Sequence, residues 1–182
     1  MLFLLPNNLI YAQDCSISGD DTVCIGVTET YSSEGGFSDF IWMVSGGGTI
    51  SSGIGTDTIE IDWGLTTGDF TVSVSSASGS CSDSMIVTIR QKENAPNVTS
   101  PVTYCENALA VPLSTNSGGT FKWYDESFNL LVGAPTPDTS TPRTTSYYVS
   151  KEGNGNGCDS DLEEIEVIIT DDTVDPVTPT LS

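Results

Sequence analysis

The residues with the clearest chemistry are cysteines, which recur with tryptophans in two similar sets. The sets are Cys24, Trp42 and Cys81, and then Cys105, Trp123 and Cys158. In both, the tryptophan follows the first cysteine by 18 residues. Cysteine pairs form lasting disulfides in oxidising compartments, and self-similarity at a fixed offset indicates tandem copies of one module. The two sets therefore predict an exported chain with two stapled modules.

The repeat also favours one disulfide pairing. Four cysteines allow three pairings, and only Cys24–Cys81 with Cys105–Cys158 keeps each bond within one copy. Each bond would close a loop of more than fifty residues, a stabilisation of about 4 kcal/mol in the chain-entropy model. We expect these bonds to clamp the ends of each module. Cys15 is left over, either as a free thiol or as a cross-link to another chain.

The aromatic residues suggest both packing and binding. A single tryptophan in the middle of a small module usually fills its core, and we expect this of Trp42 and Trp123. Trp63 stands at a strand end before Gly64, where an indole ring can be half exposed. Trp63 and Tyr124 are our candidates for ligand-facing aromatics, and Tyr147 and Tyr148 could join Tyr124 in a sugar-stacking face. Packing at an edge strand is the alternative.

Catalytic chemistry has little support. The chain contains no histidine, which removes the usual general base and the Ser-His and Cys-His pairs. Paired carboxylates would need a deep cleft, which thin sandwiches rarely supply. We therefore predict no enzymatic activity and no catalytic residues.

The charge is one-sided, with 25 acidic and 5 basic residues and a net charge of −20. Such a chain repels nucleic acid and anionic membrane surfaces, so neither is an expected partner. Solubility is the simplest role of the acidity. Calcium binding near a joint between modules is the sharper interpretation, although the spacing matches no EF-hand loop. The weak calcium candidates are Asp159, Asp161, Asp171 and Asp172.

Apolar residues after the first dozen positions alternate with a period of two, as in Phe70–Ser75, Ile59–Trp63 and Ile165–Ile169. Glycine-rich turns separate these short segments, and no helical period is present. The pattern predicts an all-β protein of two tandem antiparallel β-sandwich, immunoglobulin-like domains.

The expected boundaries follow from composition. Residues 1–13 read as a signal peptide that is truncated or part of a longer leader, and residues 14–91 form the first sandwich. A linker at 92–96 leads to a second sandwich at 97–170. The acidic, proline-containing stretch 171–182 resembles a linker to a further domain.

The first module resembles the PKD-like modules of secreted Bacteroidetes-type surface proteins. The matching stretches are Ile17–Cys24, Ile41–Gly47, Gly53–Ile59 and Ile61–Gly64. The second resembles the immunoglobulin-like module of gliding-adhesin-like surface proteins of those bacteria. Its matching stretches are Val102–Cys105, Leu113–Ser114, Phe121–Tyr124, Ala134–Pro137, Thr144–Ser150 and Asn156–Cys158.

These resemblances imply a spacer or adhesive unit of a large protein exported by type IX secretion to the cell surface. They also imply O-glycosylation at Asp-Ser/Thr-apolar triplets. The candidate residues are Thr22, Thr58, Ser84 and Thr173. The expected partners are neighbouring domains of the same polypeptide and surface glycans or a host or substrate surface. The alternative is a carbohydrate-binding accessory region of a secreted polysaccharide hydrolase. No cofactor is expected apart from the weak calcium candidates.

Overall fold

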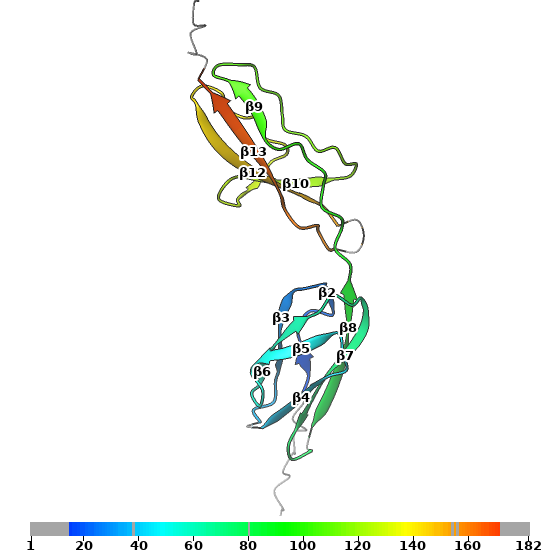
Figure 1. Ribbon diagram of the computed structural model, residues 1–182. Coiled ribbons are helices and arrows are strands. Elements are labelled where there is room, and N and C mark those ends of the chain that lie inside the picture. The colour runs from blue at the N-terminus through cyan, green and yellow to red at the C-terminus, as the bar shows by residue number, and fades with distance from the viewer. Residues whose placement is uncertain (1–14, 38, 80, 154, 156, 172–182) are drawn as a thin grey trace, which may run out of the picture. The chain divides into compact units, whose positions relative to one another are not determined.

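The computed structural model describes residues 15–37, 39–79, 81–153, 155 and 157–171 (Figure 1). The predictions made for residues 1–13, Asp172 and Thr173 lie outside these residues. The chain divides into two compact units, Met1–Gln91 (unit 1) and Lys92–Ser182 (unit 2). Every regular element in the described residues is a β-strand. No helix in this part of the chain is long and apolar enough to cross a membrane.

Unit 1 contains two four-stranded sheets, ordered β1-β3-β6-β5 and β2-β8-β7-β4. The strands are β1 Ile17–Ser18, β2 Thr22–Cys24, β3 Thr28–Ser33, β4 Phe40–Val44, β5 Gly48–Ser52, β6 Thr58–Trp63, β7 Gly68–Ser76 and β8 Ser82–Arg90. Successive side chains of a strand point to opposite faces of its sheet. In β6 this alternation buries Ile59, Ile61 and Trp63 and leaves Thr58, Glu60 and Asp62 exposed.

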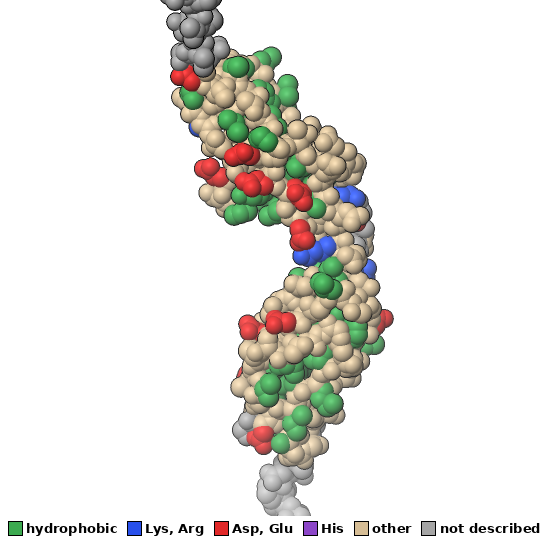
Figure 2. All heavy atoms as spheres, viewed as in Figure 1, with side chains coloured by type: hydrophobic (Ala, Val, Ile, Leu, Met, Phe, Trp, Pro, Cys, Tyr) green, Lys and Arg blue, Asp and Glu red, His purple; other side chains and the backbone are tan. Residues whose placement is uncertain are grey.

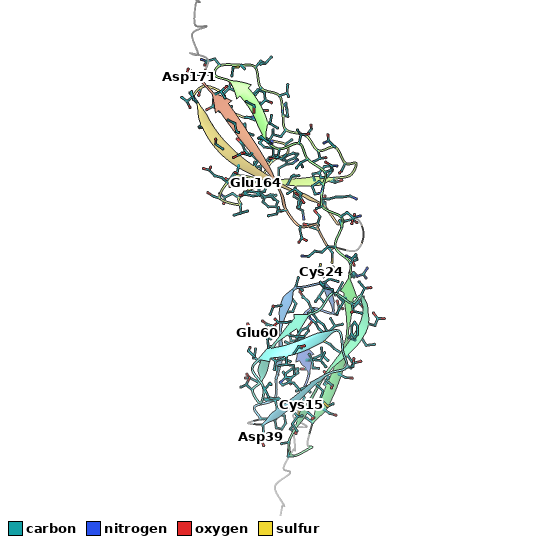
Figure 3. The ribbon with its side chains drawn as sticks, in the orientation of Figure 1. Cys15, Cys24, Asp39, Glu60, Glu164 and Asp171 are labelled. Atoms are coloured by element: carbon teal, nitrogen blue, oxygen red, sulfur yellow. A yellow bond between two sulfur atoms is a disulfide. The ribbon has the colours of Figure 1, made fainter. Side chains whose placement is uncertain are left out.

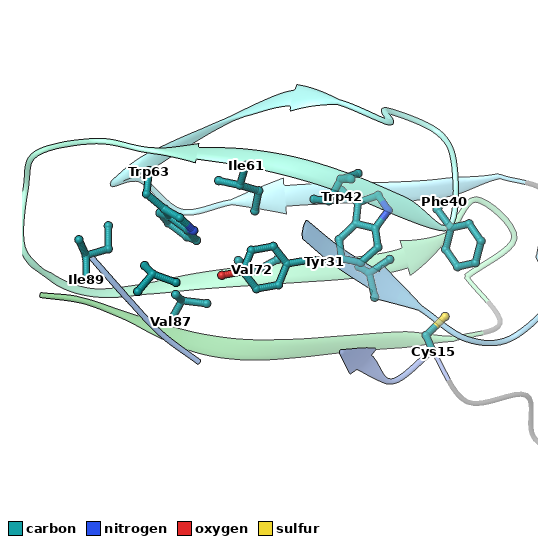
Figure 4. Packing of buried hydrophobic residues seen from close by; sticks show 12 residues of the cluster. Cys15, Tyr31, Phe40, Trp42, Ile61, Trp63, Val72, Val87 and Ile89 are labelled. Carbon is teal, nitrogen blue, oxygen red and sulfur yellow. The ribbon is translucent and has the colours of Figure 1, made fainter. Parts of the chain in front are cut away.

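The core of unit 1 lies between its two sheets (Figure 4). Tyr31 is fully buried and packs edge-on against Trp63, with the ring centroids 6.1 Å apart. The Tyr31 hydroxyl donates a hydrogen bond to the Asp20 carbonyl at 3.0 Å. Burial raises the pKa of Tyr31 to about 12. The phenol therefore stays neutral and satisfied inside the sandwich, as a buried polar tip must.

Unit 2 contains one five-stranded sheet, ordered β11-β10-β12-β13-β9. Its strands are β9 Val102–Cys105, β10 Phe121–Tyr124, β11 Leu130–Leu131, β12 Arg143–Lys151 and β13 Glu163–Thr170. Trp123, Val149 and Ile165 are buried on the inner face. Leu113, which lies outside the strands, packs against them. Its backbone N–H donates a hydrogen bond to the Pro135 carbonyl at 2.9 Å.

In each unit, an early strand pairs in parallel with the last strand. In unit 1, β2 pairs in parallel with β8, and Cys24 lies in register with Arg90. In unit 2, β9 pairs in parallel with β13, and Cys105 lies in register with Thr170. The sequence had predicted antiparallel sandwiches, and the other strand pairs are antiparallel. The parallel pairs place the first cysteine of each set beside the end of the last strand.

Candidate functional site

The outer face of the unit 2 sheet carries a row of aromatic and acidic side chains. Tyr124 of β10 lies in register with Tyr148 of β12, and Tyr148 lies in register with Glu164 of β13. Leu130 of β11 pairs with Tyr124 on its other side. Directly opposite residues of an antiparallel pair project from the same face, with Cβ atoms about 4.5–5.5 Å apart. The four side chains therefore cross the sheet as neighbours.

This row is on the outer face because its strand neighbours point inward. Trp123, Val149 and Ile165, each one position from a member of the row, are buried. Tyr124 and Tyr148 are half-buried, whereas Glu164 is exposed. Leu130 is 65% exposed. This placement on the outer face is compatible with the prediction that Tyr124 faces a ligand. Contact between Tyr124 and a ligand stays a prediction.

Phe128 adds a second aromatic layer to the row. Its ring stacks on Tyr148 with centroids 4.6 Å apart and planes inclined by 28°. Phe128 is 57% exposed. We define the aromatic row as Tyr124, Phe128, Leu130, Tyr148 and Glu164. Sequence reasoning missed Phe128, because the residue lies in a turn and follows no strand periodicity.

The turn that holds Phe128 connects β10 to β11. The Phe128 N–H donates to the Asp125 carbonyl at 3.0 Å, and the Asp125 N–H donates to the Asn129 carbonyl at 3.1 Å. This is a three-residue hairpin loop whose last residue takes a left-handed conformation, with φ of 61° at Phe128. Glycine is the usual residue there, because a side chain costs about 1–2 kcal/mol in that conformation.

The carboxylate of Asp125 organises this turn. Its Oδ1 accepts the backbone N–H groups of Ser127 and Asn129, each at 2.9 Å, and its Oδ2 accepts the Asn129 side-chain amide at 3.0 Å. The hydrogen bonds from Asn129, first from its side chain and then from its backbone, lower the pKa of Asp125. The turn is thus held by an ionised carboxylate, and Phe128 is held over Tyr148.

The carboxylate of the aromatic row, Glu164, belongs to no ion pair among the described residues. Glu164 Oε1 accepts a hydrogen bond from the Ser146 hydroxyl at 2.6 Å. The four basic residues of unit 2 each belong to an ion pair: Lys92–Asp161, Lys122–Asp159, Arg143–Asp138 and Lys151–Glu93. Lys122 precedes Tyr124 by two residues on β10 and shares its face of the sheet, so this paired cation lies beside the row. Figure 2 shows acidic side chains on the visible face of unit 2 beside hydrophobic ones. Glu164 is labelled in Figure 3.

The three tryptophans all contribute to packing. Trp42 and Trp123 are buried, and the Trp42 indole N–H donates to the Thr56 carbonyl at 2.9 Å. Trp63 is only 2% exposed, so the prediction that it faces a ligand is wrong. The alternation of β6 turns Trp63 inward together with Ile59 and Ile61. Packing in the core, rather than stacking on a ligand, accounts for Trp63.

The predicted disulfide pairing is wrong. Cys81 is bonded to Cys15, with Cα atoms 5.6 Å apart, and Cys105 is a free, exposed thiol. Cys24 lies beside Arg90, nine residues along β8 from Cys81, which is a separation of about 30 Å at roughly 3.3 Å per residue. A disulfide requires Cα atoms within about 7 Å.

Cys15, which the sequence left unpaired, is therefore the true partner of Cys81. It is 1% exposed, and the next strand begins two residues later. The Ile17 N–H donates to Asp83 Oδ2 at 2.9 Å, which brings the start of β1 beside the start of β8. Knowing that β2 pairs in parallel with β8 would have excluded a bond between Cys24 and Cys81, because the parallel pairing places Cys24 at the far end of β8.

The remaining candidates lie apart from the aromatic row. Thr22, Thr58 and Ser84 are exposed on unit 1, so glycosylation there stays a prediction. Among the calcium candidates, Asp159 is paired with Lys122 at 2.6 Å and Asp161 with Lys92 at 2.8 Å. The described part of the chain contains no group of three or more metal-ligating side chains. Asp171 is exposed at the end of the described residues.

Comparison with known proteins agrees with the architecture. Residues 11–89 match the family model described as a PKD-like domain, and residues 94–170 match the model described as an Ig-like domain, CHU_C associated. Neither description names a catalytic domain. No curated protein matches the chain in sequence.

Comparison with solved structures finds matches at low sequence identity and low TM-score. A biofilm associated protein BSP domain is 18% identical, with a TM-score of 0.35, over 93% of this chain and 32% of that one. Fibronectin(III)-like modules of Clostridium thermocellum CbhA are 12% identical, with a TM-score of 0.39, over 88% and 97%. Titin domains z1z2, solved with telethonin, are 14% identical, with a TM-score of 0.29, over 86% and 98%.

Proposed function

We propose that this pair of tandem all-β, immunoglobulin-like β-sandwich domains, the architecture that the sequence predicted, is a non-catalytic spacer and adhesive unit of a large protein outside the cell, at the cell surface. The disulfide of unit 1 supports an oxidising compartment. The resemblance to modules of exported surface proteins supports the same location.

The observation that carries the proposal is the position of the Cys15–Cys81 bond. The bond joins Cys15, the first described residue of unit 1, to Cys81, the residue just before β8, the last strand of the unit. Force applied to the two ends of unit 1 therefore passes through the bond and along β8. Residues 16–80 lie in a covalent loop outside this path. Such a unit keeps its length under tension, which is what a surface spacer requires.

The terminal strands of unit 2 resist tension by a different route. β9 and β13 are parallel neighbours in register from Val102–Val167 to Cys105–Thr170. Pulling the N-terminal side draws β9 toward its beginning, and pulling the C-terminal side draws β13 toward its end. In a parallel pair these directions oppose each other, so the hydrogen bonds between the strands share the force together. An antiparallel terminal pair would instead open one bond at a time.

Single-molecule stretching of the full chain between two marker domains tests the spacer role. In the oxidised chain, we expect no extension from the loop between Cys15 and Cys81. Reduction should release at least the 66-residue loop, an added length of about 220 Å at roughly 3.4 Å per residue. Equal extension before and after reduction would contradict the proposed role of the bond. The alternative, a carbohydrate-binding accessory region, is tested by the oligosaccharide titration described below.

A further inference from the structure

We propose that the aromatic row of unit 2 binds an arginine side chain of a partner protein. The guanidinium group would stack on the exposed face of Phe128 and donate hydrogen bonds to Glu164. The inference deepens the adhesive part of the proposed function, because it names a contact surface and a partner chemistry. The stretching experiment tests the spacer part separately, so either can fail alone.

The first argument is the combination of an aromatic face with a carboxylate beside it. Phe128 lies on Tyr148, and Tyr148 is directly opposite Glu164. A planar cation can then lie flat on a ring while its N–H groups reach the carboxylate. Arginine suits this geometry better than lysine, because its guanidinium stacks on aromatic faces and forms a fork of donors.

The second argument is charge complementarity. The chain has a net charge of −20, and the four basic residues of unit 2, including Lys122 beside Tyr124, are already paired with carboxylates that do not belong to the row. Those carboxylates are Glu93, Asp138, Asp159 and Asp161. Glu164 has a serine partner rather than a cation. An approaching cation therefore meets a negative field at the row, whereas an anionic partner is repelled.

The third argument is that the carboxylate and the ring are already held in position. The Ser146 hydroxyl donates to Oε1 of Glu164 at 2.6 Å, which orients the carboxylate before a ligand arrives. The Asp125 turn holds Phe128 over Tyr148 at the cost of a left-handed backbone conformation. Groups ordered before binding lose less conformational entropy when a ligand arrives.

Unit 1 provides a matched control for Glu164. Glu60 of β6 is also an exposed strand carboxylate, and it accepts a hydrogen bond from the Ser52 hydroxyl at 2.8 Å. Its strand neighbour Thr30 is not aromatic. Figure 3 labels both glutamates. Glu60→Gln and Glu164→Gln remove the same charge, and only the second removes it beside an aromatic ring.

The test is a titration of the full oxidised chain with the capped peptide acetyl-Gly-Arg-Gly-Arg-Gly-amide, in which calorimetry measures the affinity and NMR identifies the residues that respond. We expect shifts in the ring signals of Phe128 and Tyr148, and weaker binding of the lysine analogue. Phe128→Gly should weaken binding about two- to five-fold, the range of an exposed cation–π contact. Glu164→Gln should weaken it to a similar extent, and Glu60→Gln should not. Phe128→Asn, which also tolerates the left-handed conformation, gives a second variant that should fold and should bind like Phe128→Gly.

Three outcomes would overturn the proposal. One is equal weakening by Glu60→Gln and Glu164→Gln, which would show general attraction to an acidic chain. Another is unchanged binding in both Phe128 variants. The third is a neutral oligosaccharide such as cellohexaose shifting the Phe128 and Tyr148 signals while the arginine peptide does not. That last result would favour the carbohydrate-binding alternative.

Discussion

Cys15 is joined to Cys81 across 66 residues of sequence, with the Cα atoms 5.6 Å apart. The bond connects the start of β1 to the start of β8, and Ile17 reinforces the junction through its N–H bond to Asp83. Both cysteines belong to the same end of unit 1. The bond therefore closes nearly the whole unit into one loop, instead of joining two strands across the core.

Replacing both residues, as Cys15→Ser with Cys81→Ser, should destabilise unit 1. Removing a native disulfide from a small domain typically costs about 2–5 kcal/mol, and the loop length corresponds to about 4 kcal/mol in the chain-entropy model. Urea unfolding followed by the fluorescence of Trp42 and Trp63 measures the change. Cys105→Ser is the control, because Cys105 is a free and exposed thiol. A double variant as stable as this control would contradict the prediction.

The cysteines also show where sequence reasoning stops. The equal spacing of Cys24–Trp42 and Cys105–Trp123 predicted two modules, and the chain divides into two compact units. The period-two pattern predicted the strands. Spacing carries no information on whether the terminal strands run parallel or antiparallel. That orientation is set by tertiary pairing, and here it carries Cys24 to the far end of β8 from Cys81.

The aromatic row was predictable only in part. Tyr124 follows the inward-facing Trp123, so alternation places it on the outer face. Phe128 gave no such indication, because sequence rules expect glycine or asparagine where φ is positive. Its place over Tyr148 depends on the hairpin register between β10 and β11 and on the pairing of β10 with β12. Neither register follows from local sequence.

Phe128→Gly should leave the stability of unit 2 within about 1 kcal/mol of the wild type. The variant loses ring stacking, worth about 0.5–1.5 kcal/mol, and gains relief of about 1–2 kcal/mol from the left-handed backbone. Phe128→Val should be clearly less stable than Phe128→Gly, because a β-branched residue tolerates positive φ poorly. Urea unfolding followed by Trp123 fluorescence compares the variants. A loss above about 3 kcal/mol in Phe128→Gly would indicate a core role for the ring.

The Asp125 turn should weaken in acid. Hydrogen bonds from Asn129 lower the pKa of Asp125, so the folded state favours the ionised form. The contribution of the ionised Asp125 carboxylate to the stability of unit 2 is complete above the ordinary carboxyl pKa near 4. It is lost as the pH falls through the lower pKa of the folded state. NMR titration of the Asp125 carboxyl carbon measures the shift. In Asn129→Ala the pKa of Asp125 should move back toward the ordinary value, and an unchanged pKa would contradict this account.

The Lys122–Asp159 pair should matter more to unit 2 than the Lys92–Asp161 pair. Lys122 Nζ lies 2.6 Å from Asp159 Oδ2, and Oδ1 accepts the Gly153 N–H at 2.9 Å. Asp161 is 77% exposed, so water screens its pair more strongly. Burial acts to raise the pKa of Asp159, but the bonds from Lys122 and Gly153 outweigh it and lower the pKa. The hydrogen bond to Asp159 raises the pKa of Lys122.

These two shifts define the pH range in which the pair stabilises unit 2. The contribution of Asp159 is lost as the pH falls below about 4, and that of Lys122 is lost as the pH rises beyond about 10.4, through its raised folded value. At neutral pH, Asp159→Asn should cost about 1 kcal/mol, since both groups are about one-third exposed. Asp161→Asn, the matched control, should cost less than half of that. Urea unfolding at pH 7 and pH 3 separates the two, because the difference between the variants should shrink at pH 3. A difference that persists unchanged in acid would mean that the Asp159 side chain stabilises the unit by packing and not by charge.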